Sequence, residues 1–215
     1  MPLDDDLELL RAWRSGQPKA GHTLFRRYYD DVYRFVDSKV PAEDVEELVQ
    51  ETFATLVRKR DEFSGDASFR SYLLGIARLH LLEHYRRRHR DSLNDPLDFS
   101  RITAAELGGS MSSVLGRQRE HALLRLALPR IPLDHQILLE LYLWEEFTAA
   151  QLAQIMDIPE NTVRSRFRRA KQLLEAQVRQ LAEHPEQLTS TLETLSSWID
   201  DVQLAARRRL PSLND

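Results

Sequence analysis

The stretch Thr148-Ala-Ala-Gln-Leu-Ala-Gln-Ile-Met-Asp-Ile-Pro-Glu-Asn-Thr-Val-Arg-Ser-Arg-Phe-Arg-Arg-Ala-Lys171 decides the fold of this chain. It reads as a short helix, a tight turn and a longer basic helix, which is the pattern of a helix-turn-helix. Thr148 and Gln151 have the spacing of a capping box, and Pro159 suits the first turn of the second helix, where its missing N–H costs nothing. Asp157 stands in the turn, where we expect a left-handed backbone that aspartate tolerates better than most residues.

The second helix of this motif has an apolar face and a polar face. Val163, Phe167, Ala170 and Leu174 recur at helical spacing and predict a stripe that packs inward. The side of the helix opposite this stripe is suited to bind in a DNA major groove. Its central side chains can reach base edges, and the cations that flank them can reach phosphates. The predicted contacts to duplex DNA are Asn161, Thr162, Arg164, Ser165, Arg166, Arg168, Arg169 and Lys171.

A second basic stretch, Ser68 to Arg90, follows a loop that contains Phe63. This stretch also offers Tyr72 and Tyr85, and aromatic rings beside a basic helix are what single-stranded DNA binding needs. The same rings could equally be structural, because the inward stripe of this helix borders Tyr72. Both interpretations of the aromatics stay open.

Composition limits the class of protein. The chain has 215 residues, a formal net charge of −4 and no cysteine. Its length fits two small domains. The lack of cysteine excludes disulfides, thiolate metal sites and a cysteine nucleophile. The acidic N-terminus and the lack of a long apolar run predict neither a secretory signal nor membrane insertion, so we expect a cytoplasmic protein.

The periodicity of the chain is helical almost throughout. Glycine is scarce and no alternating apolar strands are visible, which predicts an all-α fold. The predicted helices are 3–15, 18–39, 42–59, 68–90, 113–130, 133–146, 149–156, 160–182 and 186–209. Residues 91–112 are rich in Asp, Ser and Gly and have the composition of a flexible interdomain linker.

No enzyme site or metal site is expected. His80 and His84 have the i, i+4 spacing of helical metal ligands, with Glu83 between them. The glutamate is misplaced for the metalloprotease pattern and no third ligand is evident, so we predict neither a metal nor another cofactor. No catalytic grouping of Ser, His and Asp can be recognised without geometry.

Two motifs in the first half and their order carry a family resemblance. Glu47-Leu-Val-Gln-Glu-Thr-Phe53 is followed by Phe63-Ser-Gly-Asp-Ala-Ser-Phe-Arg-Ser-Tyr-Leu-Leu-Gly-Ile-Ala-Arg78, an arginine run, a linker and the helix-turn-helix. In this order, and over residues 24–90 and 123–181, the chain resembles an extracytoplasmic-function (group IV) sigma factor of bacterial RNA polymerase. The resemblance implies region 2 in residues 1–90, a linker in 91–112, region 4 in 113–182 and a C-terminal extension in 183–215.

The resemblance also implies a non-enzymatic specificity subunit whose partners are the RNA polymerase core, met at its clamp helices and flap, and promoter DNA. Region 2 would melt the start-proximal promoter element, capturing a flipped base at loop Asp61–Ser68, and region 4 would read the upstream element. Whether an anti-sigma factor exists stays open, and Leu79 stands where the family commonly has asparagine, which leaves the base preference open. The implied contacts to the polymerase clamp are Glu47, Gln50 and Glu51; the implied contacts to the melted strand are Phe63, Ser64, Asp66, Arg70, Tyr72, Arg78, Arg86, Arg87 and Arg88.

Two other functions remain as alternatives. A stand-alone helix-turn-helix repressor would bind duplex DNA by itself, and an antagonist would occupy a sigma-binding surface without opening DNA. The arginine-lined helix argues against the antagonist, because mimicry needs no DNA-binding face. The acidic linker residues suit a segment that the family threads toward the RNA path, although a plain tether explains them about as well; they are Asp91, Asp95, Asp98 and Glu106.

The last segment of the chain carries a heptad seam that needs another surface to bury it. The seam consists of Leu188, Leu192, Leu195, Ile199 and Val202, followed by Ala206. One hypothesis is that this segment folds back on region 2 or region 4 and restrains binding, so that truncation before Pro185 would raise promoter activity. The alternative is an extra helix that stabilises region 4.

Overall fold

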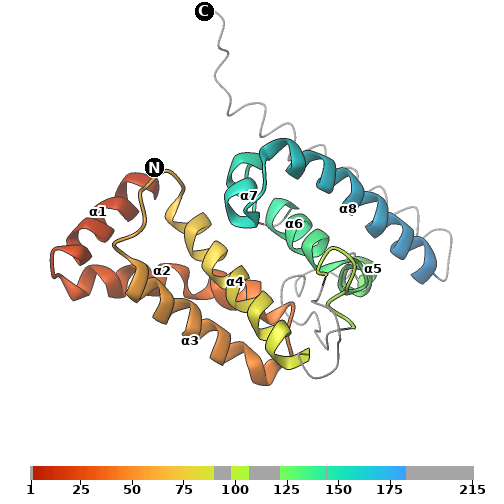
Figure 1. Cartoon of the computed structure of the whole chain (residues 1–215), viewed down its shortest axis with the longest axis horizontal. Helices are drawn as coiled ribbons and strands as arrows, with labels where there is room; N and C mark the ends of the chain where they lie inside the picture. Colours follow the sequence, from red (N-terminus) through yellow and green to blue (C-terminus); the bar gives the residue numbers. More distant parts are fainter. Residues whose placement is uncertain (1, 90–97, 107–121, 144, 183–215) are drawn as a thin grey trace, which may run out of the picture. The chain divides into compact units, whose positions relative to one another are not determined.

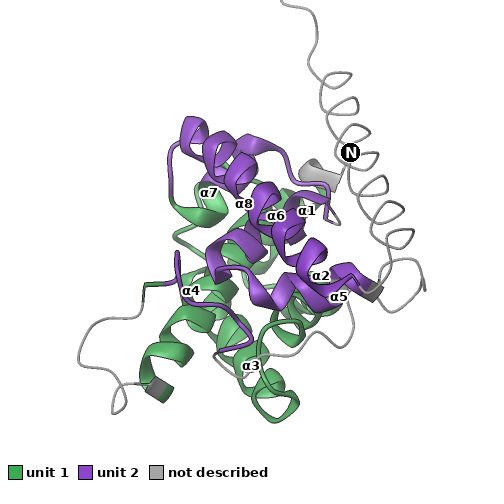
Figure 2. Ribbon diagram, turned by 90° about the vertical axis from the view of Figure 1, so that its right-hand side faces the viewer, with its two compact units in different colours: residues 1–98, 107–114, 154–157 green, residues 99–106, 115–153, 158–215 purple. Residues whose placement is uncertain are grey.

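The structure, a computed structural model, describes residues 2–89, 98–106, 122–143 and 145–182. Throughout these ranges the regular secondary structure is helical, apart from one isolated β-bridge between Thr103 and Pro132. The all-α prediction is therefore confirmed. The chain divides into two compact units, coloured separately in Figure 2. The first carries residues 1–98 and also takes in residues 154–157; the second carries 99–106, 122–153 and 158–182 of the described chain.

The first unit is a helical bundle (Figure 1). It contains α1 (Pro2–Arg14), α2 (Pro18–Asp37), α3 (Ala42–Lys59) and α4 (Phe69–His89). Helix α2 packs on each of the other three, and α3 packs along α4. The interior is aliphatic and aromatic; its most buried members include Leu24, Val32, Leu48, Leu56, Phe69, Leu73 and Leu81. The predicted bounds of α3 are confirmed, and those of α1, α2 and α4 are correct within two residues.

The corner between α1 and α2 has clear local causes. Gly16 turns the chain at φ +95°, a conformation that suits glycine, and Pro18 occupies the first turn of α2. Gly21 lets α2 approach the indole of Trp13, because a Cβ at this glycine would lie only 2.5 Å from the ring. Trp13 also meets Phe25 edge to face, at 6.0 Å between ring centres. The end of α1 is thus fixed against α2.

The second unit contains α5 (Ala122–Ala127), a 3-10 turn (Leu128–Arg130), α6 (Leu133–Leu143), the part of α7 (Ala149–Met156) up to Ala153, and α8 (Glu160–Leu181). Helix α8 packs on α5 and α6. The predicted helix 113–130 is described only from residue 122, and it closes as a 3-10 turn around Pro129, which lacks an N–H. The predicted helix 133–146 was too long: α6 ends at Leu143, and Glu146 has φ 53°, which is not helical.

Part of the predicted linker, residues 99–106, packs as folded structure. Residues 99–106 belong to the second unit, with Phe99 and Ala104 buried. Their backbone bonds to the segment before α6: the amide of Leu133 donates to the carbonyl of Ile102, and that of Ala105 to the carbonyl of Pro129. The composition of this segment predicted a tether, but burial of its apolar side chains stabilises it as part of the second unit. Residues 91–97 and 107–112, and the seam Leu188, Leu192, Leu195, Ile199 and Val202, lie outside the described residues.

Candidate nucleic-acid interface

The turn between α7 and α8 has the predicted chemistry. The amide of Thr148 donates to Oε1 of Gln151 at 2.9 Å and the amide of Gln151 donates to Oγ1 of Thr148 at 3.3 Å, which confirms the capping box. Asp157 has φ 54°, the left-handed conformation expected there. Helix α8 begins at Glu160 as predicted, and Pro159 is its N-cap rather than a residue of its first turn. Its carbonyl accepts from the amides of Thr162 and Val163.

Helix α8 buries one face and exposes the opposite face. Val163, Ala170 and Leu174 are buried as predicted, and Val178 extends this stripe by another turn. Phe167 is half-buried, with its ring 4.4 Å from that of Tyr142 in α6. The exposed residues of the predicted DNA face are Asn161, Arg164, Ser165, Arg168 and Arg169; Thr162, Arg166 and Lys171 are half-exposed.

Ion pairs hold the cations at the edges of that face. Arg164 lies 2.9 Å from Glu160, one turn earlier, and Lys171 lies 3.8 Å from Glu175, one turn later. Arg166 instead reaches Asp134 in the first turn of α6, at 3.6 Å. Arg166 therefore also links α8 to α6. The exposed pair of Arg164 and Glu160 contributes only about 0–1 kcal/mol, so a phosphate can displace it at little cost.

The loop Asp61–Ser68 of the first unit has a buried anchor and an exposed tip. Phe63 is only 5% exposed, and its ring lies 5.9 Å from that of Phe69 and 4.8 Å from that of Tyr72. Phe63 is therefore buried in the core, which favours the structural interpretation of this ring; its contact with the melted strand stays a prediction. Its neighbours Ser64 and Asp66 are exposed, and the Ser64 hydroxyl donates to the Asp66 carboxylate at 2.6 Å.

The two tyrosines of α4 differ in exposure. Tyr85 is fully buried and its hydroxyl donates to the carbonyl of Lys39, so it is a structural residue. Tyr72 is half-exposed and its hydroxyl donates to the carbonyl of Lys59 at 3.2 Å. Burial raises the pKa of both phenols. Of the two aromatic rings, only Tyr72 keeps exposed surface that a base could contact.

Three of the five predicted cations of α4, namely Arg70, Arg87 and Arg88, are held by acidic residues of neighbouring helices. Arg70 lies 2.6 Å from Asp31 of α2, and Arg87 lies 3.2 Å from Glu51 of α3. The remaining three predicted cations are Arg88, which is paired with Asp44 of α3; Arg86, which lies 3.9 Å from Glu83; and Arg78, which is largely buried at 9% exposed. The arginine run Arg86, Arg87 and Arg88 stays exposed despite these pairs.

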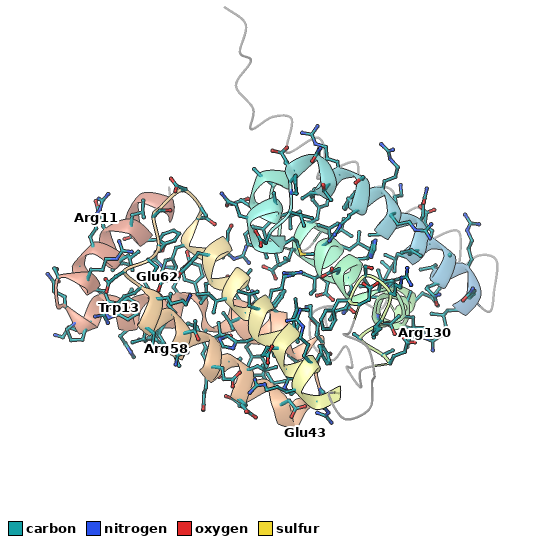
Figure 3. All side chains as sticks on the ribbon, in the orientation of Figure 1. Arg11, Trp13, Glu43, Arg58, Glu62 and Arg130 are labelled. Carbon is teal, nitrogen blue, oxygen red and sulfur yellow. The ribbon has the colours of Figure 1, made fainter. Side chains whose placement is uncertain are left out.

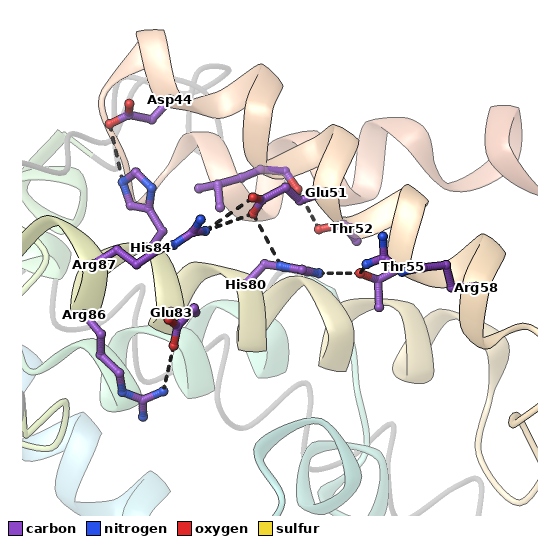
Figure 4. Close-up of polar contacts among 11 residues, drawn as sticks. Asp44, Glu51, Thr52, Thr55, Arg58, His80, Glu83, His84, Arg86 and Arg87 are labelled. Carbon is purple, nitrogen blue, oxygen red and sulfur yellow. Dashed lines mark hydrogen bonds and ion pairs between the residues drawn. The ribbon is translucent and has the colours of Figure 1, made fainter.

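Helices α3 and α4 share a polar seam, shown in Figure 4. His80 lies with Nε2 2.8 Å from the Thr55 hydroxyl and Nδ1 3.4 Å from Glu51, while His84 lies 3.5 Å from Asp44. Burial lowers the pKa of both imidazoles below the ordinary value of 6.5, and the facing carboxylates only partly offset that effect. Each histidine therefore faces a carboxylate on the neighbouring helix. Among the residues described, no group of three metal-ligating side chains comes together.

The outer face of α3 carries the predicted polymerase contacts. Glu47 and Gln50 are exposed, whereas Glu51 is half-buried against α4. Glu51 thus belongs both to the predicted polymerase face and to the seam with α4. Leu79 on α4 is 62% exposed, an unusual position for a leucine that the sequence had marked only as a departure from the family.

Sequence reasoning missed the residues that anchor these faces. Asp134 holds Arg166, Asp31 holds Arg70, and Arg14 of α1 holds the loop that carries Phe63. The first turn of α6 gave a weak signal for Asp134, because acidic residues are common there. Arg14 and Asp31 are isolated charges within helices, and no local sequence pattern marks their roles. Within the described residues, no helix combines the length and apolarity that crossing a membrane requires.

Comparisons with known proteins agree with both units. Residues 24–91 match the family Sigma-70 region 2, and residues 121–174 match the family Sigma-70, region 4. The ECF RNA polymerase sigma-E factor of Escherichia coli (strain K12) is 28% identical over 183 residues, covering 82% of this chain and 95% of the relative. The factor of the same name from Haemophilus influenzae is 27% identical over 184 residues, covering 82% of this chain and 96% of its own.

Two solved structures share the fold. CnrH, in complex with the cytosolic domain of CnrY, gives a TM-score of 0.60 at 19% identity, covering 83% of this chain and 99% of that one. The sigma factor RpoE, in complex with the anti-sigma factor NepR from Bartonella quintana, gives a TM-score of 0.58 at 18% identity, covering 74% of this chain and 96% of that one. With the two regions matched in order and the helix-turn-helix formed as the motif requires, the chain belongs to the extracytoplasmic-function sigma factors of bacterial RNA polymerase.

Proposed function

We propose that this sigma factor directs the RNA polymerase core to promoters by a division of labour between its two units. The exposed face of α8 reads the upstream element in the major groove, with Arg168 and Arg169 at its centre and the paired cations at its edges on phosphates. The tip of the loop Asp61–Ser68 and the exposed arginines of α4 hold the melted strand. The outer face of α3 meets the polymerase clamp.

The observation that supports the proposal most is the charge arrangement of α8. Its buried stripe, from Val163 to Val178, fixes which side of the helix faces out, and that side carries the exposed Arg164, Arg168 and Arg169. This local positive face stands in a chain with a net charge of −4. A basic face on an otherwise acidic protein favours nucleic acid as the partner of that face.

The DNA face of the first unit follows from different residues. Ser64 and Asp66 at the loop tip are exposed and polar, and Tyr72 offers a partly exposed ring that packs against Phe63 of the same loop. Extruding a base from the duplex costs a few kcal/mol, so a capturing loop must supply hydrogen bonds and stacking of about that size. Phe63 supports the loop from inside the core.

The test is run-off transcription with purified core polymerase and a pool of genomic promoter fragments, with and without the protein. Discrete new start sites are expected, and aligned upstream sequences would give both promoter elements. Tight duplex binding by the isolated protein, together with no new transcripts, would instead support a stand-alone repressor. Loss of transcription by another sigma factor in the same assay, without new starts, would indicate an antagonist.

A further inference from the structure

Arg14, at the end of α1, binds the backbone of the loop that precedes α4. Its Nε donates to the carbonyl of Arg60 at 2.9 Å and its Nη2 donates to the carbonyl of Phe63 at 2.8 Å. A guanidinium presents its N–H groups as a fixed fork, so one side chain spans both carbonyls. The Asp61 carboxylate lies 3.6 Å away and faces the same guanidinium. Arg14 therefore fastens the loop at two points across its first turn.

Other residues of α1 lie against the same loop. The Arg60 guanidinium sits over the Trp13 ring, 5.3 Å from its centre. A methyl carbon of Leu7 lies 3.5 Å from the place that a Cβ on Gly65 would occupy, and Gly65 has φ +92°. Helix α1 thus contacts the loop from Arg60 to Gly65. Figure 3 shows Arg11 of the same helix pointing outward from the bundle.

The far side of the loop is fixed by the core and by α4. Phe63 is buried between Phe69 and Tyr72, and the Tyr72 hydroxyl donates to the carbonyl of Lys59. Ser68 caps α4, because its hydroxyl accepts from the amide of Ser71 at 3.0 Å. Between the buried Phe63 and the capping Ser68, the side chains of Ser64 and Asp66 at the tip are exposed. The loop is therefore anchored on both sides of its tip.

We propose that Arg14 is a positioning residue for capture of the melted strand. It touches no nucleotide itself; it holds the carbonyls of Arg60 and Phe63, so that Ser64 and Asp66 present their polar groups in a fixed arrangement. This role rests on the proposed function of the loop. Holding a binding loop in its bound shape improves affinity by removing the entropy cost of ordering it. Arg14 precedes the residues matched to Sigma-70 region 2, which begin at residue 24.

The first arm of the test measures the loop alone. In the complete chain, Arg14→Gln removes the charged fork, Arg14→Lys keeps the charge but cannot span both carbonyls, and Arg11→Gln is the matched control on the exposed side of α1. Amide hydrogen exchange is followed in peptides covering 61–67 and, as a check of folding, in α2. Faster exchange of the loop by about tenfold is expected in both Arg14 variants, with α2 unchanged in Arg14→Lys. Loop exchange equal to the wild type in both variants would overturn the proposal.

The second arm measures strand capture. Each variant is assembled with core polymerase, and its affinity is measured for a single-stranded oligonucleotide carrying the melted element found by run-off transcription, and for a scrambled oligonucleotide. Arg14→Gln should lose about tenfold in affinity for the matched strand, with core affinity, scrambled-strand affinity and Arg11→Gln unchanged. The positioning role would be overturned if Arg14→Gln speeds hydrogen exchange in the loop but leaves the ratio of matched-strand to scrambled-strand affinity unchanged.

The two arms separate failure of the inference from failure of the proposed function. A wild-type holoenzyme that does not prefer the matched strand would count against strand capture by this loop, and the positioning role would fall with it. The exchange measurement would still decide whether Arg14 holds the loop. Arg14→Lys should retain part of the matched-strand preference, because one of the two carbonyls can keep a charged donor.

Discussion

Nη2 of Arg87 on α4 lies 3.2 Å from Oε2 of Glu51 on α3. The same carboxylate oxygen lies 3.4 Å from Nδ1 of His80. Glu51 is a proposed contact of the polymerase, and Arg87 a proposed contact of the melted strand. One carboxylate therefore connects the proposed polymerase surface with the proposed strand-binding surface. If the polymerase bound Glu51, the charge of Arg87 would be less neutralised and more available to a DNA phosphate.

Replacing Glu51 should strengthen binding of single strands by the isolated protein. We expect Glu51→Gln to raise affinity for a non-specific oligonucleotide about two- to fivefold, because an exposed pair of this kind contributes roughly 0–1 kcal/mol. Fluorescence anisotropy at fixed ionic strength measures it. Glu43→Gln is the control, since it removes the same charge from an exposed position in the first turn of α3. Equal gains in the two variants would mean that only net charge matters.

The seam between α3 and α4 should make the first unit sensitive to acid. Burial lowers the pKa of His80 and His84 below 6.5, so the unfolded chain takes up protons at a higher pH than the folded chain. Their neutral forms therefore contribute stability above pH 6.5 that is lost as pH falls through the folded pKa. Urea unfolding at pH 7.5 and 5.5 should show a lower midpoint at pH 5.5, and the double variant His80→Gln, His84→Gln should show a smaller difference.

A single tryptophan can report this unit alone. Of the three tryptophans, Trp13 lies in the first unit, so substituting Trp144 and Trp198 with phenylalanine leaves its fluorescence as the probe. This matters because burial also lowers the pKa of His135 in the second unit. An unchanged pH dependence in the double histidine variant would assign acid sensitivity to other groups, with Asp44, Glu51, Arg58, Arg87 and Arg88 as the charges around the seam.

Helical periodicity was sufficient to predict most of the fold. The stripe Val163, Ala170 and Leu174 and the capping pair Thr148 and Gln151 are local features, so the sequence carries them directly. The end of α6 was not predictable in the same way, because Glu146 is a good helix former placed in a left-handed conformation. The ordered segment 99–106 was missed because its stability comes from distant partners before α6.

The site was harder to predict than the fold. Exposure of Arg168 and Arg169 follows from the helix period, but the burial of Phe63 and Tyr85 depends on how α4 packs with other elements. Composition marks an aromatic residue in a loop without saying which way its ring points. The partners of Arg70 and Arg87 come from α2 and α3, at sequence separations of 39 and 36 residues, and no local pattern connects them.

Phe63 should behave as a core residue when it is replaced. Phe63→Ala is expected to reduce the free energy of unfolding of the first unit by about 3–5 kcal/mol, because it removes a buried ring from contact with Phe69 and Tyr72. Ser64→Ala, at the exposed neighbour, should change stability by less than about 0.5 kcal/mol and weaken matched-strand binding by the holoenzyme. Urea unfolding followed at Trp13 gives the stabilities. A stable Phe63→Ala protein with lost strand binding would restore the exposed-ring interpretation.

The edge cations of the α8 DNA face should carry the salt dependence of upstream-element binding, and its central arginines the preference for the matched sequence. Arg164→Ala is expected to lower the slope of log affinity against log salt by about 0.9, because this edge cation is proposed to meet one phosphate. Arg168→Ala should instead lose affinity on the matched duplex without a change of slope. Arg179→Ala is the matched control, since it removes an exposed arginine from the last turn of the same helix. The measurement is titration of the holoenzyme onto an upstream-element duplex between 50 and 200 mM salt, about the range over which phosphate contacts are resolved. A change of slope at Arg168 that is equal on matched and scrambled duplexes would place that arginine on a phosphate. Wild-type slopes and affinities in both the Arg164 and the Arg168 variants would remove this face of α8 from DNA recognition.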